Sequence, residues 1–319
     1  METSDGFADA GQPLPGSTPR SWSGGPELTV IIASYNARRT IETCLDSLRL
    51  QNSSRTFETI LVDSSTDGTA DLVRQRYPEV QLITSTSRLF PGGARNVGFK
   101  AAQAKIIAFL DADCFVESGW VDAILEAHRT PHYLVSGAVL NGTPERPVAW
   151  AYYFCEFSHW LPGGKIREIR EAPGCCLSFK REAYEAYGPF IEGTYSSDTA
   201  FHWRAWRDGH KVYLDPAIRV FHRTLYNVRE YLNHVAYHRR CYARVKVRET
   251  RLGLAGRLAH VGLTPVLPFL LLTAIGTRVV QSRRFLRKFL GCLPLLFAGL
   301  CARAWGEFLG FLITGPGES

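Results

Sequence analysis

The sequence predicts an α/β fold in which a mostly parallel, Rossmann-like sheet is flanked by helices. Three observations lead to this class. Short apolar, β-branched segments alternate with segments of helical periodicity, several of them end in polar clusters, and hydrophobic residues make up 45% of the 319 positions. A chain of this length folds as one large domain or as one domain with an appendage. Its composition excludes tandem-repeat, fibrous and mostly disordered proteins.

The predicted elements follow one another at short spacing. Residues 28–33 (LTVIIA) form a β-branched apolar run, and residues 40–50 have helical periodicity with Thr40 as the expected cap. The alternation continues with strands at 59–62, 80–83 and 106–110 and helices at 69–77 and 93–103. Strands that alternate with helices in this way form a parallel, doubly wound sheet, whose ligands bind beyond the carboxyl ends of the strands.

Polar side chains follow three of these strands, at Ser34 to Asn36, at Asp63, and at Asp111 and Asp113. Because all three clusters lie at carboxyl ends, we expect them to converge on one crevice. The two carboxylates at 111 and 113 can lie beside one cation, and oxygen ligands suit Mg²⁺ or Mn²⁺, although an Asp-x-Asp also occurs in solvated turns. Asp63 either accepts a hydrogen bond from a base or ribose, or forms an Asx-turn.

Four motifs in this order and spacing resemble the nucleotide-sugar half of family 2 glycosyltransferases. They are VIIASYN at 30–36, VDSSTDGT at 62–69, GARNVG at 93–98 and FLDAD at 109–113. The resemblance covers residues 26–222 and implies the GT-A fold, a nucleotide-diphosphate-sugar donor, a divalent metal and inversion at the anomeric carbon.

The resemblance also implies roles for individual residues of the donor half. The side chains implied to bind the nucleotide sugar are Ser34, Tyr35, Asn36, Asp63, Arg95, Asn96 and Asp111. Asp113 would be the more direct metal ligand, with Asp111 beside it in the Asp-x-Asp motif.

The acceptor half of the resemblance covers residues 114–222. Residues 172–181 are similar to the family's segment under the sugar and the acceptor. Asp198 stands where the family has the Asp of a Glu-Asp pair and inherits the role of catalytic base, while Ser197 replaces the Glu. His222 resembles a late His that reaches the diphosphate or the metal, although a His after an apolar strand is more often structural.

Charge divides the chain into unequal parts. The formal charge is +7, but residues 223–319 hold 15 Lys and Arg against 4 Asp and Glu, a local charge of +11, and residues 1–222 hold 22 against 26. We expect a glycosyltransferase domain at 26–222, whose nucleotide-sugar half is 26–113, then basic connecting helices at 223–257 and apolar, membrane-associated helices at 258–319. This distribution argues against a nucleic-acid partner.

Residues 1–25 are rich in Ser, Gly, Pro and Asp and lack an apolar core, which predicts a flexible leader and no export signal. The eight cysteines show neither a Cys-x-x-Cys pair nor a disulfide framework, so we expect reduced thiols. Both observations predict a catalytic domain in the cytoplasm.

Two apolar segments in the last third indicate a membrane. Residues 258–277 are largely uncharged and long enough to span a bilayer, and 289–314 are apolar except for Arg303 and Glu307. A crossing hairpin would place a basic loop outside, against the positive-inside rule. We therefore favour interfacial or re-entrant helices that bind anionic lipids on the cytoplasmic face, with Arg303 and Glu307 on a polar face. A two-span hairpin and buried soluble helices are the alternatives.

Six aromatic residues lie between Trp150 and Trp160. Core packing explains most such runs, and the alternative is an acceptor-binding lip on which sugars stack or lipid lies. Residues 161–167 hold the glycine and charge expected of a mobile lid.

Together these patterns predict a membrane-attached inverting glycosyltransferase, with a UDP-sugar favoured as donor and a lipid-linked or cell-surface saccharide as acceptor. A polyprenyl-phosphate glycosyltransferase is a close variant, and a nucleotidyltransferase would share the sheet. A non-catalytic nucleotide-sugar or nucleic-acid binding protein is the alternative from another class. It is disfavoured because the positive residues flank apolar segments and not base-stacking aromatics. The oligomeric state stays open.

Overall fold

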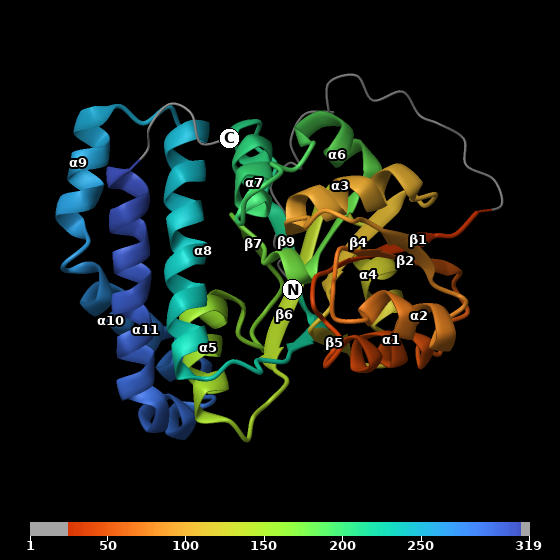
Figure 1. Cartoon of the computed structure of the whole chain (residues 1–319), viewed down its shortest axis with the longest axis horizontal. Coiled ribbons are helices and arrows are strands. Elements are labelled where there is room, and N and C mark those ends of the chain that lie inside the picture. The colour runs from red at the N-terminus through yellow and green to blue at the C-terminus, as the bar shows by residue number, and fades with distance from the viewer. Residues whose placement is uncertain (1–24, 314–319) are drawn as a thin grey trace, which may run out of the picture.

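The computed structural model describes residues 25–313, so the predicted leader and the last six residues lie outside the described range, apart from Gly25. Within this range the strands form one nine-stranded sheet of order β3-β2-β1-β4-β8-β6-β9-β5, with β7 paired to β9 (Figure 1). They are β1 (Leu28–Ser34), β2 (Phe57–Asp63), β3 (Gln81–Thr84), β4 (Ile106–Asp111), β5 (Cys114–Val116), β6 (Leu134–Asn141), β7 (Arg167–Ile169), β8 (Leu177–Lys180) and β9 (Val212–His222). The predicted α/β class is confirmed.

The first half of the sheet has the predicted parallel arrangement. β1 lies between β2 and β4 and is parallel to both, and β3 extends the same layer beyond β2. In the second half, β6 and β9 are parallel, whereas β8 is antiparallel to β4 and β6, and β5 and β7 are antiparallel to β9. Each antiparallel pairing is three residues long, so the sheet remains mostly parallel.

Helices cover both faces of the sheet. Their bounds are α1 (Ile41–Arg49), α2 (Thr69–Arg76), α3 (Pro91–Ala101), α4 (Trp120–Ala127), α6 (Arg181–Tyr187) and α7 (Ser197–Arg207). Val30 and Ile32 of β1 pack into the core on one face, and Ile31 packs into the core on the other. This alternation follows from the two-residue period of a strand. α3 starts at Pro91, earlier than predicted, because the first turn of a helix needs no N–H donor from proline.

The carboxyl ends of β1, β2 and β4 lie side by side. In the register of the sheet Ser34 pairs with Asp63, and Ala33 pairs with Asp111. The three polar clusters therefore meet at one edge of the sheet, where a doubly wound topology places its ligands.

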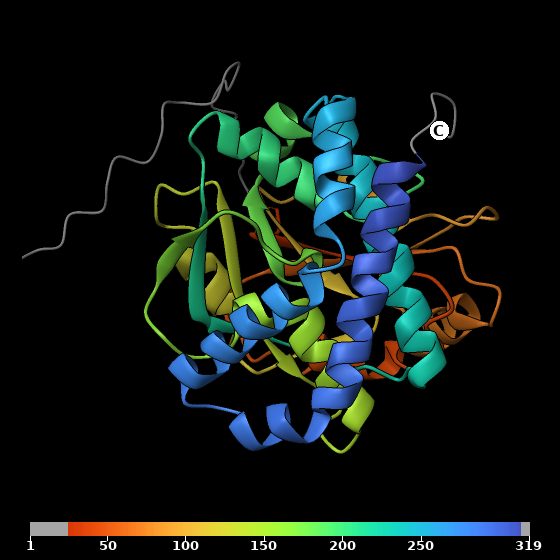
Figure 2. The same cartoon turned by 90° about the vertical axis from the view of Figure 1, so that its left-hand side faces the viewer.

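A helical layer stands to one side of the sheet (Figures 1 and 2). Its elements are α5 (Pro147–Phe157), the short helix η1 (Ser158–Trp160), α8 (Val228–Glu249), α9 (Leu254–Leu263), α10 (Leu267–Ser282) and α11 (Leu286–Leu312). A second short helix, η2 (Gly174–Cys176), precedes β8. α8 begins at a capping box in which Asn227 and Glu230 satisfy each other's backbone N–H groups.

Glycines of α11 allow its backbone to approach α8 closely. A Cβ atom at Gly306 would overlap the carbonyl oxygen of Ala236, and one at Gly310 would lie 2.6 Å from the carbonyl oxygen of Arg240. A Cβ atom at Gly299 would overlap the hydroxyl of Tyr231. α11 is thus fitted closely against α8 along one side.

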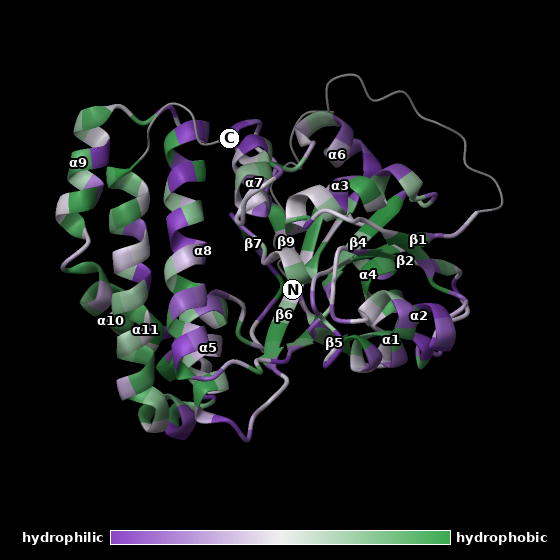
Figure 3. Cartoon of the chain, in the orientation of Figure 1, coloured by the Kyte–Doolittle hydropathy of each residue, from purple (hydrophilic) through white to green (hydrophobic). Residues whose placement is uncertain are grey.

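The apolar tail forms three helices that Figure 3 shows as mostly hydrophobic, in contrast to α8. Within the described range, α11 is the one unbroken helix that is long and apolar enough to cross a membrane. In its most apolar 18-residue stretch, 39% is buried inside the protein. The predicted continuous segment at 258–277 is instead divided into α9 and α10, which bend by 68° at a break that contains Pro265. Whether the tail spans the membrane or lies on it stays a prediction.

Arg303 and Glu307 do not lie on the exposed polar face expected of an interfacial helix, because both side chains pack inside the protein. Glu307 is 9% exposed and accepts hydrogen bonds from Arg239 of α8 at 2.6 and 2.9 Å. Arg303 lies 3.7 Å from Glu307 and donates to the carbonyl of Cys155 in α5 at 3.2 Å. Both side chains therefore connect α11 to the interior, because a buried charge needs charged and hydrogen-bonding partners.

Candidate active site

A cavity of about 1600 Å³ opens at the carboxyl ends of β1 and β4 and is bounded on its other side by α5, η1, α7, α8 and the C-terminal helices. Its size exceeds that of ordinary small-molecule pockets and fits two substrates. The predicted site residues that line it are Ser34, Tyr35, Asn36, Arg95, Asp111, Asp113, Asp198 and His222. Asp63 and Asn96 are not among its lining residues.

Asp63 is buried and does not line the cavity, and its carboxylate accepts hydrogen bonds from neighbouring hydroxyls. The Oγ atoms of Ser34 and Ser65 donate to Asp63 Oδ1 at 2.6 and 2.5 Å, and the backbone N–H of Ser65 donates to Oδ2 at 3.3 Å. The side chain is 1% exposed. The structure thus shows the Asx-turn, and contact of Asp63 with a base or ribose stays a prediction.

Tyr35 and Arg88 form the exposed rim of the donor side. The guanidinium of Arg88 lies 4.3 Å from the centre of the Tyr35 ring, which is 41% exposed. Asn36 has a left-handed backbone, with φ of 52°, and its side-chain oxygen accepts from the N–H of Thr66. A flat aromatic ring backed by a planar cation suits a nucleobase. Sequence reasoning missed Arg88, whose contact with Tyr35 spans 53 positions.

Asn96 lies inside the fold and not on the cavity wall, and its place beside the nucleotide stays a prediction. Its amide nitrogen donates to the carbonyl of Phe190 and to Glu192, and its oxygen accepts from Tyr184 and from the N–H of Phe190, all at 2.9 to 3.0 Å. The residue is 3% exposed. With its hydrogen-bonding groups satisfied inside the fold, Asn96 joins α3 to the segment after α6.

Arg95 joins the two halves of the site. Its side chain is 4% exposed and forms an ion pair of 2.8 Å with Asp111, over the ring of Phe109. Burial raises the pKa of Asp111 above its ordinary value, Arg95 acts against this, and the neighbouring Asp113 adds to it. Two neighbouring carboxylates favour the binding of a cation, which would then lie between the carboxylates and a diphosphate.

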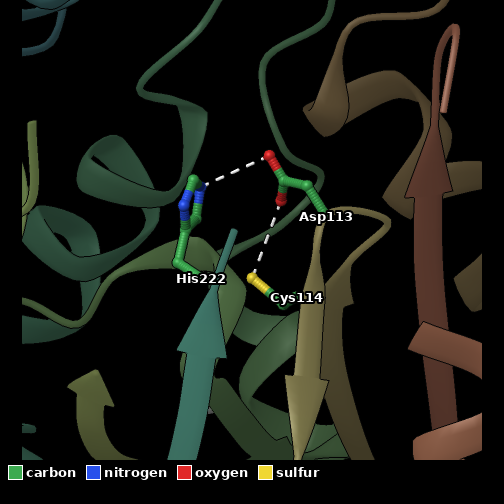
Figure 4. Close-up of side chains that lie close together, drawn as sticks. All are labelled: Asp113, Cys114 and His222. Carbon is green, nitrogen blue, oxygen red and sulfur yellow. Dashed lines mark hydrogen bonds and ion pairs between the residues drawn. The ribbon is translucent and has the colours of Figure 1, made fainter. Parts of the chain in front are cut away.

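Asp113 and His222 face each other across the β5–β9 pair (Figure 4). His222 Nε2 lies 3.4 Å from Asp113 Oδ2, and His222 Nδ1 lies 3.3 Å from the hydroxyl of Thr224, which orients the ring. Cys114 is fully buried below them, with its Sγ 3.7 Å from Asp113 Oδ1. The groups that reach the cavity are thus carboxylate oxygen and imidazole nitrogen, a donor set that fits Mn²⁺ or Mg²⁺.

Asp198 lies in the first turn of α7 and shares the wall of the cavity with Arg95. Between them passes Gly174 of η2, where a Cβ atom would come 2.6 Å from Arg95 Nη1 and 2.8 Å from Asp198 Oδ2. Only glycine at position 174 allows both side chains to stay where they are. Ser197 is 2% exposed and packs against Gly92 of α3, where its small size fits the close approach of the two helices.

The aromatic segment from Trp150 to Trp160 lies partly in the core and partly on the cavity wall, and its binding of an acceptor stays a prediction. Tyr153 and Phe154 are buried in the core, whereas Tyr152 and Trp160 also line the cavity. Glu156 lies in the same wall beside His238; burial alone would raise its pKa, but His238 and nearby arginines outweigh burial and lower it. This carboxylate therefore stays ionised in the acceptor half of the cavity.

The predicted lid forms part of the cavity wall. Pro162, Gly163 and Gly164 line it, and both glycines have left-handed backbones, with φ of 93° and 85°. Such φ values explain why the segment carries glycine. Its motion stays a prediction.

Comparison with known proteins places this geometry in a family. The model of glycosyl transferase family 2 matches residues 29–188, half of the chain. Glycosyltransferase AglE of Haloferax volcanii is 28% identical over 184 residues, which are 56% of this chain and 60% of AglE. Validoxylamine A glucosyltransferase of Streptomyces hygroscopicus subsp. limoneus is 29% identical over 50% of this chain and 36% of its own length. The chain thus spans under two thirds of these relatives.

Two solved structures share the fold. Mannosyltransferase PcManGT from Pyrobaculum calidifontis, in complex with GDP-Man and Mn²⁺, has a TM-score of 0.58 and 21% identity, with 90% of each chain covered. S. aureus TarS 1-349, in complex with UDP-GlcNAc, has a TM-score of 0.51 and 14% identity, over 86% of this chain and 90% of that one. The predicted GT-A fold is confirmed, and the chain belongs to glycosyl transferase family 2.

Proposed function

We propose that the protein is an inverting glycosyltransferase that moves a sugar from a nucleotide diphosphate to a hydroxyl of a lipid-linked or cell-surface saccharide. One observation carries this proposal. A single cavity holds a base-stacking rim at Tyr35, paired carboxylates at Asp111 and Asp113, and the separate carboxylate of Asp198. Donor binding, diphosphate neutralisation and proton acceptance need these three groups within reach of one another.

The donor binds at the carboxyl ends of β1 and β4. Tyr35 and Arg88 stack on the base, and Ser34 and Asn36 border the ribose. A UDP-sugar is favoured, and the fold relatives crystallised with GDP-Man and with UDP-GlcNAc support testing both nucleotides with hexosyl donors.

Asp113 and His222, with Asp111 beside them, would hold Mg²⁺ or Mn²⁺. A bound cation supplies positive charge that stabilises the leaving diphosphate. Arg95 keeps the Asp111 carboxylate in place through its 2.8 Å ion pair, which frees Asp113 to face the cavity.

Asp198 acts on the acceptor. It takes the proton of the acceptor hydroxyl while the hydroxyl oxygen forms a bond to the anomeric carbon. The bond from that carbon to the diphosphate oxygen breaks, and its electron pair leaves with the nucleoside diphosphate. Attack opposite the leaving group inverts the configuration. General-base assistance contributes about 10²- to 10⁴-fold to such a step.

A donor panel tests the function. The protein in lipid nanodiscs is incubated with UDP-, GDP- and dTDP-hexoses, with Mn²⁺ or EDTA, and release of nucleoside diphosphate is measured. Metal-dependent release with at least one donor is expected. Release of inorganic diphosphate from a sugar phosphate and a nucleoside triphosphate would indicate a nucleotidyltransferase, and neither release nor nucleotide binding would leave the non-catalytic alternative.

The tail attaches the enzyme to the cytoplasmic face of the membrane. In support, 12 of the 18 large apolar side chains exposed in the described range lie between residues 254 and 313, and the surrounding chain carries the +11 charge. Lys and Arg near anionic lipid contribute about 1 kcal/mol each. Salt extraction tests this: high salt releases an interfacial form, whereas a spanning form resists both salt and alkaline carbonate.

A further inference from the structure

The wall of the cavity is rich in arginine. Among the described lining residues, 10 are Arg and 6 are Asp or Glu, so the wall carries a positive excess of four charges.

Three of these arginines come from the C-terminal helices and surround η1 and the predicted lid. We call Arg278, Arg284 and Arg303 the arginine cluster. Arg278 of α10 lies 3.4 Å from the hydroxyl of Ser158, and Arg303 of α11 reaches the carbonyl of Cys155. Arg284, between the two helices, lies beside Gly163, where a Cβ atom would be 3.5 Å from its guanidinium carbon.

The cluster is short of negative charge. Neither Arg278 nor Arg284 has a carboxylate within 4 Å among residues 25–313, and Arg303 shares Glu307 with Arg239 at the longer distance of 3.7 Å. The Nε atom of Arg303 is buried without a hydrogen-bond partner in that range. Burial, together with Arg278, Arg303 and Arg239, lowers the pKa of nearby His159 to about 4. Arginines that lack a close carboxylate partner favour the binding of anions. The planar guanidinium group, with its parallel N–H donors, fits phosphate in particular.

We propose that the arginine cluster binds the phosphate or diphosphate group of a lipid-linked acceptor. This inference rests on the proposed function and specifies its acceptor. The donor diphosphate does not need these arginines, because Asp111, Asp113 and His222 already provide a cation site for it.

A lipid phosphate is favoured over a soluble phosphoglycan by the surroundings of the cluster. Arg278 lies in α10, which also carries the exposed side chains of Phe269, Leu270 and Val280, and Arg284 follows the end of this helix. The lipid chain can lie along this apolar surface while its phosphate enters the cavity. Asp198 is the proposed base for a neutral hydroxyl. The phosphate therefore anchors the acceptor, and the hydroxyl is the nucleophile.

Direct binding tests the subsite without relying on transfer. The full chain in phosphatidylcholine nanodiscs is titrated with farnesyl diphosphate, inorganic diphosphate and farnesol, in EDTA so that the metal-dependent donor site does not contribute. We expect farnesyl diphosphate to bind most tightly. Arg278→Ala and Arg284→Ala should each weaken it by about tenfold or more, the usual effect of one charged hydrogen bond. Arg287→Ala, which removes an equal charge outside the cavity, should leave it unchanged.

Unchanged affinity in both cluster variants would overturn the proposal, and equal affinity for inorganic diphosphate would overturn its lipid part. The donor-hydrolysis panel is run on the same variants and should be unaffected. A silent panel would refute the proposed function while the farnesyl diphosphate titration still reports on the subsite. Transfer to polyprenyl phosphate that is independent of Asp198 would also contradict the assignment, because the phosphate would then be the nucleophile.

Discussion

Substitution of Gly306 by Ala tests whether α11 is fitted against α8 as the structure has it. The new Cβ atom would overlap the carbonyl oxygen of Ala236 and lie 2.8 Å from its carbonyl carbon. Carbon atoms pack best at about 3.5 to 4.0 Å, so the helices must separate by about 1 Å. The obstacle is backbone, and no rotamer change removes it. Overpacking of this kind costs about 1–3 kcal/mol, more than the roughly 1 kcal/mol that Ala gains over Gly in a helix.

Gly291 provides a matched control in the same helix. It is exposed, and a Cβ atom there would meet nothing within 4 Å. Gly291→Ala should therefore raise the free energy of unfolding by up to about 1 kcal/mol, while Gly306→Ala lowers it. In a chain of this size each kcal/mol shifts the midpoint by about 2–4 °C. Thermal unfolding in one detergent, followed by tryptophan fluorescence, compares the two variants with the unsubstituted protein. Shifts of the same sign and size would refute the packing of α11 on α8.

The site carries four further predictions. Asp198→Asn should bind the donor normally yet lose at least about 10²-fold in transfer of radiolabelled sugar, and near-normal turnover would remove it from the mechanism. Asp113→Ala should lose Mn²⁺-dependent nucleotide binding in calorimetry, and equal affinity with and without Mn²⁺ in the unsubstituted protein would refute a metal role. Gly174→Ala should lower kcat by about 10²-fold, since it displaces Arg95 and Asp198; an unchanged kcat would contradict this. Asn96→Ala should lower the unfolding midpoint without changing nucleotide affinity, and a selective loss of nucleotide binding would support its predicted role.

The donor half of the fold could be predicted from sequence because its information is local. The strands and helices between residues 28 and 111 are short and alternate regularly. This local pattern places Ser34 and Asp111 at strand ends, whatever contacts the two side chains make in the folded protein. The acceptor half lacks this regularity. β8 pairs with β4 and β6 over only three residues each, and such register is decided by packing between distant segments.

Two predicted donor residues, Asp63 and Asn96, show the same limit, because neither lines the cavity. Asp63 accepts hydrogen bonds from Ser65, two positions away, and from Ser34, 29 positions away. The partners of Asn96 include Tyr184 and Glu192, 88 and 96 positions away. Whether a polar side chain lines a cavity or forms its hydrogen bonds inside the fold can be judged only after the chain is folded.

The basic residues of the last third lie in two different environments. Of its 15 basic residues, five line the cavity, at Arg223, Arg239, Arg278, Arg284 and Arg303, and the other ten do not. The ten can act on anionic lipid head groups from outside, where salt screens them within about 8–10 Å. The five act inside a cavity, where screening is much weaker. High salt should therefore weaken membrane attachment well before it weakens binding of an anionic acceptor. The segment proposed to bind the lipid surface also forms one wall of the cavity, and this arrangement would couple membrane attachment to acceptor binding.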